Sequence, residues 1–187
     1  TMGFKVITPP TEPVTLADAR LHLRVTDTSE DTLIASLTTA AREYCEHYLQ
    51  RAVGSQTLEL ALDEFPDGPI ELPMGPVASI TSIKYIDANQ AEQTLSGSLY
   101  TLDDYSHQSW VIPAYDTEWP ATLEAANVVK VRYVAGSATP PSAVIAAMKL
   151  IIGHLYENRE QSIVGVSVTE LPLGVKALLD TKRIWSL

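Results

Sequence analysis

The spacing of apolar residues changes twice along this chain, and the changes separate two helical ends from a β-rich middle. Near the N-terminus, Leu16, Ala19 and Leu23 have helical spacing after Thr15, a residue type that caps helices. A longer helical stripe follows in residues 31–51. Its apolar positions are Leu33, Leu37, Ala40, Tyr44 and Tyr48, widened by Ile34, Ala41 and Cys45. We therefore expect two helices before residue 54.

From residue 55 the period of the pattern becomes two, which is typical of β-strands. Leu58, Leu60 and Leu62 alternate with other residues, and a cluster of Pro, Asp and Gly ends this first run. Further strand candidates are residues 70–72, 79–87, 93–95, 100–102, 110–112 and 127–134. In the last of them, Val129, Val131 and Tyr133 share one face, and the opposite face carries charge.

Helical spacing returns after Pro140, with Thr139 expected as N-cap and Pro140 as the first helical residue. The stripe consists of Val144, Ile145, Met148, Ile151, Ile152, Leu155 and Tyr156, and a short terminal helix is expected within 175–185. Neither long helix is long enough to be stable alone, so each needs the apolar face of the other. We predict an α+β fold in one domain, 1–187: a small helical core from 14–52 and 140–185, with a β-rich insertion, 55–136, in the middle.

Two apolar segments have no place in this scheme. Phe4, Val6 and Ile7 precede a pair of prolines, and a second segment lies between the last two helices. The second segment contains Ile163, Val164, Val166 and Val168. We predict that both contact another protein chain; the alternative is that they fold back onto this chain's own sheet.

Composition and charge exclude several classes of partner. Thirteen Lys+Arg oppose twenty-three Asp+Glu, and the resulting net charge of −10 disfavours a DNA-binding module because it repels phosphates. No apolar run approaches the roughly 18 residues of a membrane span, so no membrane partner is expected. The first residues lack the apolar stretch of a secretory signal, and we expect the chain to stay in the cytoplasm where it is made.

The sequence offers no catalytic motif. It lacks a G-x-S-x-G nucleophile elbow and a phosphate-binding Gly-rich loop, and Cys45 lies in an apolar stripe that indicates a buried thiol. We predict no enzyme activity, no catalytic residues, no cofactor and no metal.

One metal site is an alternative. Glu43 with His47, and His154 with Glu157, lie one helical turn apart on two helices expected to pack together. A metal-dependent enzyme is thus a second hypothesis, although the apolar faces of these helices are carried by their neighbours.

Trp110 and Trp119 could form a stacking platform, but without basic neighbours a core or subunit-contact role is favoured.

Several segments together resemble the head-tail connector (head completion or adaptor) proteins of long-tailed phages and prophages. The segments are ITPPTEPVTLADARLHLRV, DTLIASLTTAAREYCEHYL, IELPMGPVASITSIKYID and GHLYENRE followed by ELPLGVKALL. The resemblance spans nearly the whole chain, and residues 15–25, 156–160 and 171–175 carry it best.

The resemblance implies a virion structural subunit in a ring of about a dozen copies. Such a ring joins the portal protein to an adjacent connector or to the tail, and genome DNA passes through without specific binding. The arm of residues 4–10 and the segment 161–174, including Leu171 and Leu173, become candidates for subunit or portal contacts. Another virion ring protein, such as a tail terminator or head-closure protein, is an alternative.

Overall fold

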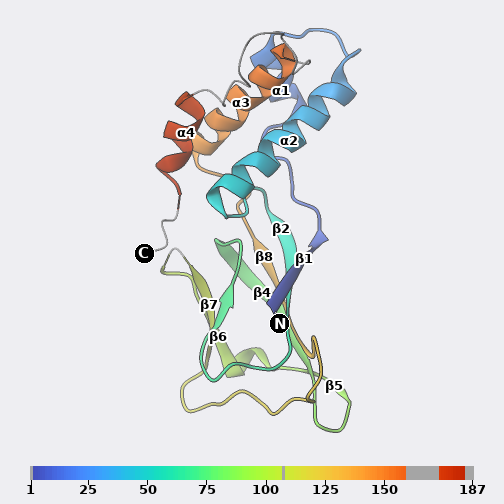
Figure 1. Cartoon of the computed structure of the whole chain (residues 1–187), viewed down its shortest axis with the longest axis vertical. Helices are drawn as coiled ribbons and strands as arrows, with labels where there is room; N and C mark the ends of the chain where they lie inside the picture. Colours follow the sequence, from blue (N-terminus) through green and yellow to red (C-terminus); the bar gives the residue numbers. More distant parts are fainter. Residues whose placement is uncertain (1, 107, 159–172, 184–187) are drawn as a thin grey trace, which may run out of the picture. The chain divides into compact units, whose positions relative to one another are not determined.

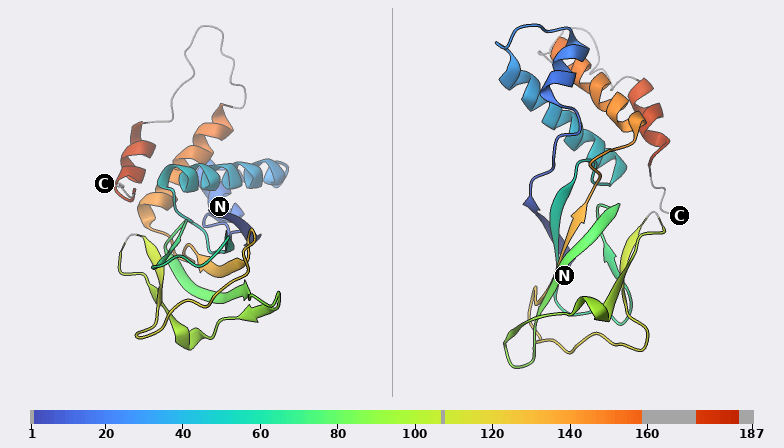
Figure 2. Two further views of the ribbon diagram at one scale, coloured as in Figure 1. Left: turned by 60° about the horizontal axis from the view of Figure 1, so that its bottom comes forward. Right: turned by 180° about the vertical axis from the view of Figure 1, so that it is seen from behind.

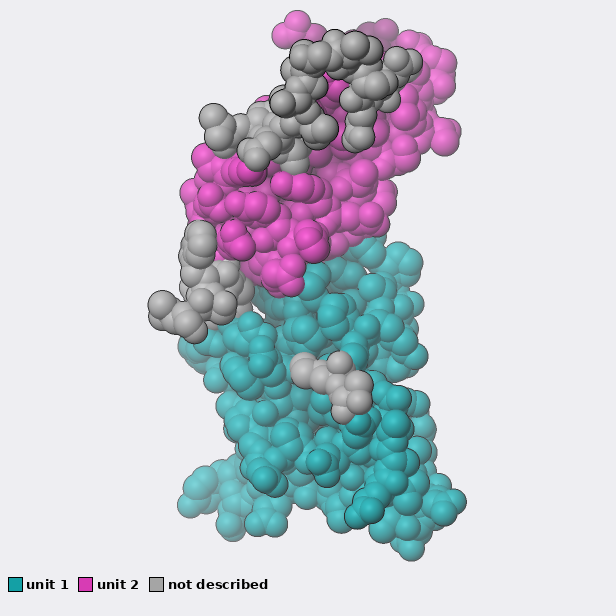
Figure 3. All heavy atoms as spheres, in the orientation of Figure 1, with its two compact units in different colours: residues 1–11, 55–137 teal, residues 12–54, 138–187 magenta. Residues whose placement is uncertain are grey.

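The structure is a computed structural model that describes residues 2–106, 108–158 and 173–183, and it divides into two compact units (Figures 1 and 3). Unit 1 comprises residues 1–11 and 55–137, and unit 2 comprises residues 12–54 and 138–187. The predicted α+β class is confirmed: unit 2 holds the helices, which come from both ends of the chain, and unit 1 holds the strands. The expectation of a single domain stays a prediction.

Unit 2 is built from four helices (Figure 1). They are α1 (Leu16–Leu23), α2 (Asp31–Leu49), α3 (Ser142–Glu157) and α4 (Leu173–Asp180). Thr15 caps α1 as predicted, because its hydroxyl accepts a hydrogen bond of 3.1 Å from the backbone N–H of Asp18.

The start of α3 was predicted two residues too early. The carbonyl of Pro141 accepts the first helical hydrogen bonds, from the N–H groups of Val144 and Ile145 at 2.9 and 3.2 Å. Pro140 cannot be the first helical residue, because a residue that precedes a proline is sterically disfavoured in the helical region.

The core of unit 2 is apolar and comes from both ends of the chain. Its fully buried members are Val14, Ala19, Ile34, Ala41, Cys45, Leu49, Val53, Val144, Ala147, Met148, Ile151, Ile152, Val175 and Leu179. The buried side of α2 is therefore centred on Ile34, Ala41 and Cys45, whereas Leu33 and Leu37 are half-buried and Ala40 is exposed. The sequence placed the centre of the stripe about one residue away from the side that α2 buries.

Unit 1 contains a five-stranded antiparallel sheet in the order β1-β2-β8-β4-β5 and a three-stranded sheet in the order β3-β7-β6 (Figure 2). The strands are β1 (Met2–Thr8), β2 (Gln56–Leu62), β3 (Ile70–Leu72), β4 (Val77–Ile86), β5 (Glu92–Thr94), β6 (Tyr100–Asp103), β7 (Ser109–Pro113) and β8 (Val129–Ala135). A 3-10 turn, η1 (Gly97–Leu99), precedes β6. The strand candidates after residue 55 are confirmed, and β1 is an additional strand.

The two faces of the larger sheet differ as the alternation in β8 predicts. Leu60 pairs with Val131 and Leu58 pairs with Tyr133, and all four side chains are buried. The hydroxyl of Tyr133 donates a hydrogen bond of 2.9 Å to the carbonyl of Pro73, directly after β3. Burial raises the pKa of Tyr133 above its ordinary value, which favours the protonated hydroxyl that donates this bond.

Candidate assembly surfaces

The N-terminal arm lies on this chain's own sheet as its edge strand β1. Phe4 pairs with Leu60 of β2 and Val6 pairs with Leu58, and the register shifts between Val6 and Thr8. The apolar side chains of the arm nevertheless stay exposed: Phe4 by 48%, Val6 by 52% and Ile7 by 37%. The arm thus folds back onto this chain's own sheet, which was the alternative in the sequence analysis. Its predicted contact with another chain remains compatible with this position, because an edge strand with exposed apolar side chains can accept a partner.

On the other face of the larger sheet, a ladder of charged side chains crosses β1, β2 and β8. The carboxylate of Glu59 on β2 lies 3.2 Å from the ammonium of Lys5 on β1 and accepts two hydrogen bonds, at 2.5 and 3.1 Å, from the guanidinium of Arg132 on β8. Burial alone would raise the pKa of Glu59, but the hydrogen bonds and charges of Arg132 and Lys5 outweigh it and lower the pKa. This ladder fixes the edge strand in register.

The second predicted contact segment lies outside the described residues. This applies to Ile163, Val164, Val166, Val168 and Leu171, whereas Leu173 is the first residue of α4. The assignment of all these residues to subunit contacts stays a prediction.

A groove opens between two loops of unit 1, residues 63–67 and 117–124. It encloses about 590 Å³, and the rings of Phe65 and Trp119 stack in its wall with 5.0 Å between centroids and 6° between planes. The indole N–H of Trp119 donates a hydrogen bond of 2.9 Å to the carbonyl of Gly68, and Phe65 also meets the ring of Tyr85 edge-on. The position of Trp119 therefore fits either expected role, a place in the core of unit 1 or a subunit contact.

The second loop of the groove is attached to the sheet by its backbone. The N–H of Leu123 donates to the carbonyl of Ile86 at 3.0 Å, and the N–H of Asn127 donates to the carboxylate of Asp63 at 2.9 Å. These bonds hold both walls in place, so the groove is a preformed feature.

Negative charge is concentrated in unit 1, whose few basic residues share one face of the larger sheet. Unit 1 contains twelve Asp+Glu and four Lys+Arg, so it carries −8 of the net charge of −10. All four basic residues, Lys5, Lys84, Lys130 and Arg132, share the outer face of the larger sheet according to the strand register. Among the residues that line the groove there is no Lys or Arg, and Glu64, Asp67, Glu118 and Glu124 are exposed there.

A buried ionic cluster in unit 2 was not anticipated from the sequence. The guanidinium of Arg42 on α2 lies 2.5 Å from Glu46, 3.2 Å from Glu12 and 3.6 Å from Glu43. Glu46 also accepts a hydrogen bond of 2.9 Å from the N–H of Val53. The cluster joins the segment before α1 to α2 and, through Glu46, to Val53 after α2. The spacing of four residues between Arg42 and Glu46 was the sequence signal for it.

The proposed metal ligands form no site in the part of the chain that the structure describes. Glu43 and His47 lie on α2, and His154 and Glu157 lie on α3, but no group of three or more His, Cys, Asp or Glu side chains is arranged to hold a metal among the described residues. Cys45 is fully buried, as predicted, and burial together with the charge of Glu46 raises the pKa of its thiol to about 12. Such a thiol is not a reactive nucleophile.

Among the described residues, no helix is both long and apolar enough to cross a membrane.

Comparison with known proteins points to phage particles. Residues 13–103 match the family model of phage gp6-like head-tail connector proteins, and this match confirms the resemblance drawn from the sequence. No curated protein matches the sequence.

The fold of the whole chain also occurs in solved structures of gene transfer agent (GTA) particles. A chain in the neck of an empty GTA particle, computed with C6 symmetry, is 22% identical with a TM-score of 0.81, and the match covers 99% of this chain and 97% of that one. A chain in the virion of a native GTA particle is 24% identical with a TM-score of 0.79, covering 98% and 96%. A chain in the native neck computed with C12 symmetry is 21% identical with a TM-score of 0.79, covering 99% and 97%. At these identities the likeness establishes a common fold.

Proposed function

We propose that this protein is a structural subunit of a phage head-tail connector ring that joins the portal to the tail or to the next connector and lets genome DNA pass. The observation that carries the proposal is the connector family match over residues 13–103, together with a fold shared over nearly the whole chain with a protein of GTA particle necks. The protein acts by assembly and not as an enzyme, in the virion, after assembly in the host cytoplasm.

The symmetry of the neck structures supports a ring. Those structures were computed with C6 and C12 symmetry, which fits a ring of about a dozen copies of a subunit with this fold. In such a ring each subunit uses two different surfaces, one for each neighbour. The exposed apolar residues of β1, Phe4, Val6 and Ile7, are one candidate surface for a neighbouring subunit or for the portal.

The charge distribution supports passage of DNA without binding. Unit 1 carries most of the negative charge, and its acidic loops would repel the phosphate backbone wherever they face the bore. A duplex that is repelled equally from all sides stays free to slide.

The proposal is tested by native mass spectrometry and light scattering of the chain alone and with a purified portal protein. We expect a monomer or a weak ring alone and a high-order complex with the portal, because ring interfaces of moderate area are completed on a template. A chain that stays monomeric and does not bind the portal at any concentration would refute the proposal. Binding to a tail protein but not to the portal would instead indicate a tail terminator or head-closure protein.

A matched pair of variants tests the contact surface on β1. Phe4→Ser with Val6→Ser should weaken ring or portal assembly while the circular dichroism spectrum stays unchanged. Tyr105→Ser removes a fully exposed aromatic side chain of unit 1 that lies outside β1, in the segment after β6, and should leave assembly unchanged. If both variants assemble equally well, β1 is not part of the interface.

A further inference from the structure

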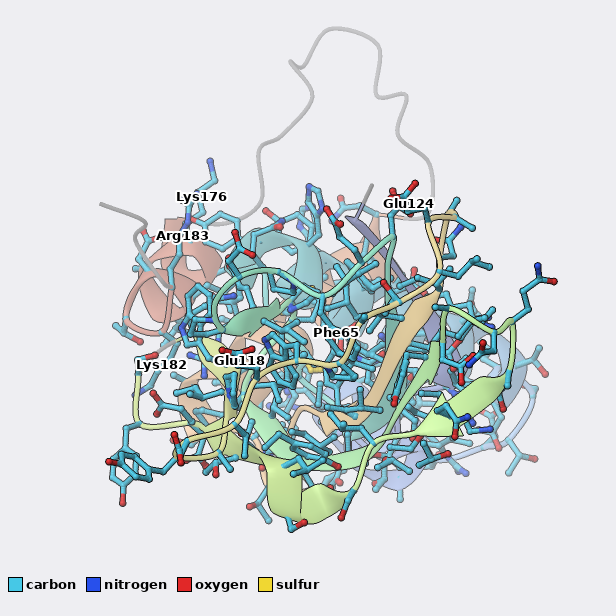
Figure 4. The ribbon with its side chains drawn as sticks, turned by 90° about the horizontal axis from the view of Figure 1, so that it is seen from below. Phe65, Glu118, Glu124, Lys176, Lys182 and Arg183 are labelled. Carbon is cyan, nitrogen blue, oxygen red and sulfur yellow. The ribbon has the colours of Figure 1, made fainter. Side chains whose placement is uncertain are left out.

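We infer that the acidic groove of unit 1 receives the basic end of α4 from a second copy of this chain. The inference rests on the proposed ring and names the two surfaces that would close it. The groove is lined by the stacked rings of Phe65 and Trp119 and by exposed carboxylates. What we call the basic end of α4 consists of Lys176 within the helix and of Lys182 and Arg183, which follow its last residue, Asp180 (Figure 4).

The chemistry of the groove favours a cationic side chain. Phe65, Glu118 and Glu124, which Figure 4 labels, all line the groove, and the two carboxylates belong to the loop 117–124. A guanidinium can make two kinds of contact with such a surface: its planar face stacks on an aromatic ring, and its N–H groups donate hydrogen bonds to carboxylates. The groove is also held open by backbone hydrogen bonds, so a ligand does not have to order it first.

Basic side chains cluster around the end of α4. Three of the thirteen Lys+Arg of the chain lie within residues 176–183, with Asp180 as the one acidic residue there. Lys182 and Arg183 are exposed. Arg183 lies over the ring of Tyr48 at 5.1 Å from its centroid, and the Tyr48 hydroxyl donates a hydrogen bond of 2.7 Å to Asp180. These contacts orient the basic end on the surface of unit 2.

A second copy is the occupant that a ring requires. A head-to-tail interface repeats one pairing of two different surfaces, and this chain presents an acidic groove on one unit and a basic end on the other. Opposite charges on the two surfaces also speed the encounter of subunits and disfavour groove-to-groove contacts, because like charges repel.

Two charge-reversal variants test the pairing. The groove variant is Glu118→Lys with Glu124→Lys, and the helix variant is Lys182→Glu with Arg183→Glu. In either variant alone both surfaces have the same sign, so the concentration of half-maximal assembly should rise about tenfold or more. A one-to-one mixture should assemble like the wild type, because an alternating ring places opposite charges at every interface.

The mixture separates a contact between copies from a contact within one chain. A groove–helix contact inside one chain would be restored in the four-fold variant, which carries both reversals, but not in the mixture. Rescue in the mixture therefore supports the inference, and rescue confined to the four-fold variant overturns it. Asp103→Lys with Asp104→Lys, the same change of charge on unit 1 away from the groove, should assemble like the wild type.

Failure of the inference is distinguishable from failure of the proposed function. If wild type and both reversal variants assemble equally with the portal, the ring stands and this pairing is wrong. If the wild type forms rings that the variants lose, but no portal binds, the pairing stands and the connector role is wrong. Assembly through this pairing should also weaken between about 0.1 M and 1 M salt, over which the screening length falls from about 10 to 3 Å.

Discussion

Removing the guanidinium at the centre of the ionic cluster in unit 2 should destabilise the helical unit strongly. Arg42→Met keeps the length and packing of the stem but leaves Glu46, whose side chain is 10% exposed, without its partner at 2.5 Å. Removing one partner of a buried ion pair lowers the unfolding free energy by roughly 3–5 kcal/mol. Glu46 keeps its bond from the N–H of Val53, and Glu12 is 33% exposed, so we expect a loss of about 2–4 kcal/mol.

The loss is measured by urea unfolding followed by far-UV circular dichroism, since all the described helices belong to unit 2. Glu43→Gln is the matched control: its carboxylate is 3.6 Å from the same guanidinium but 66% exposed, so it should cost less than about 1 kcal/mol. Adding Glu46→Gln to Arg42→Met should recover at least half of the loss, because it removes the negative charge that faced the guanidinium and keeps an acceptor for Val53. A cost for Arg42→Met no larger than that of Glu43→Gln, or no recovery in the double variant, would refute the reasoning.

Three further results are expected. Tyr133→Phe leaves the carbonyl of Pro73 without its donor and should lower the unfolding free energy of unit 1 by about 1–2 kcal/mol, read from tryptophan fluorescence in urea; no change would show that water replaces the hydroxyl. The pKa of Glu59 is lowered from 4.5 in the folded chain, so the ionised carboxylate stabilises unit 1 above pH 4.5, and this stabilisation is lost as the pH falls through the lower, folded pKa. Glu59→Gln should therefore make the unfolding free energy fall less steeply with acid. A curve parallel to that of the wild type would contradict the ladder. Cys45, with its thiol pKa raised to about 12, should react with a thiol reagent only after urea unfolding, and rapid labelling of the folded chain would disprove its burial.

Local patterns determined much of the fold. The hydroxyl of Thr15 could be recognised as a cap because capping depends only on a neighbour three residues away. The alternation of Val129, Val131 and Tyr133 predicted a buried face because side chains of a strand point to opposite sides in strict order. The return of helical spacing after residue 140 likewise predicted that the two chain ends share a core, since neither amphipathic helix can bury its apolar face alone.

The candidate surfaces depended on tertiary structure. The pairing of β1 with β2 was only an alternative in the sequence analysis, because β2 begins about fifty residues later without a hairpin turn between them and because the apolar side chains of β1 remain exposed. The groove at Phe65 and Trp119 combines two loops that only the sheet brings together. The net charge was visible in the sequence, but only the strand register shows that Lys5, Lys84, Lys130 and Arg132 share a single face of the larger sheet.

The sequence by itself thus determined most of the helices and strands, the buried face of β8, and the resemblance to connector proteins, because these follow from local periodicity and from the joint occurrence of short segments. Tertiary structure alone decided where exposed apolar residues, aromatic stacks and unbalanced charge meet. Those positions depend on pairings between residues far apart in the chain, and no local pattern encodes such pairings.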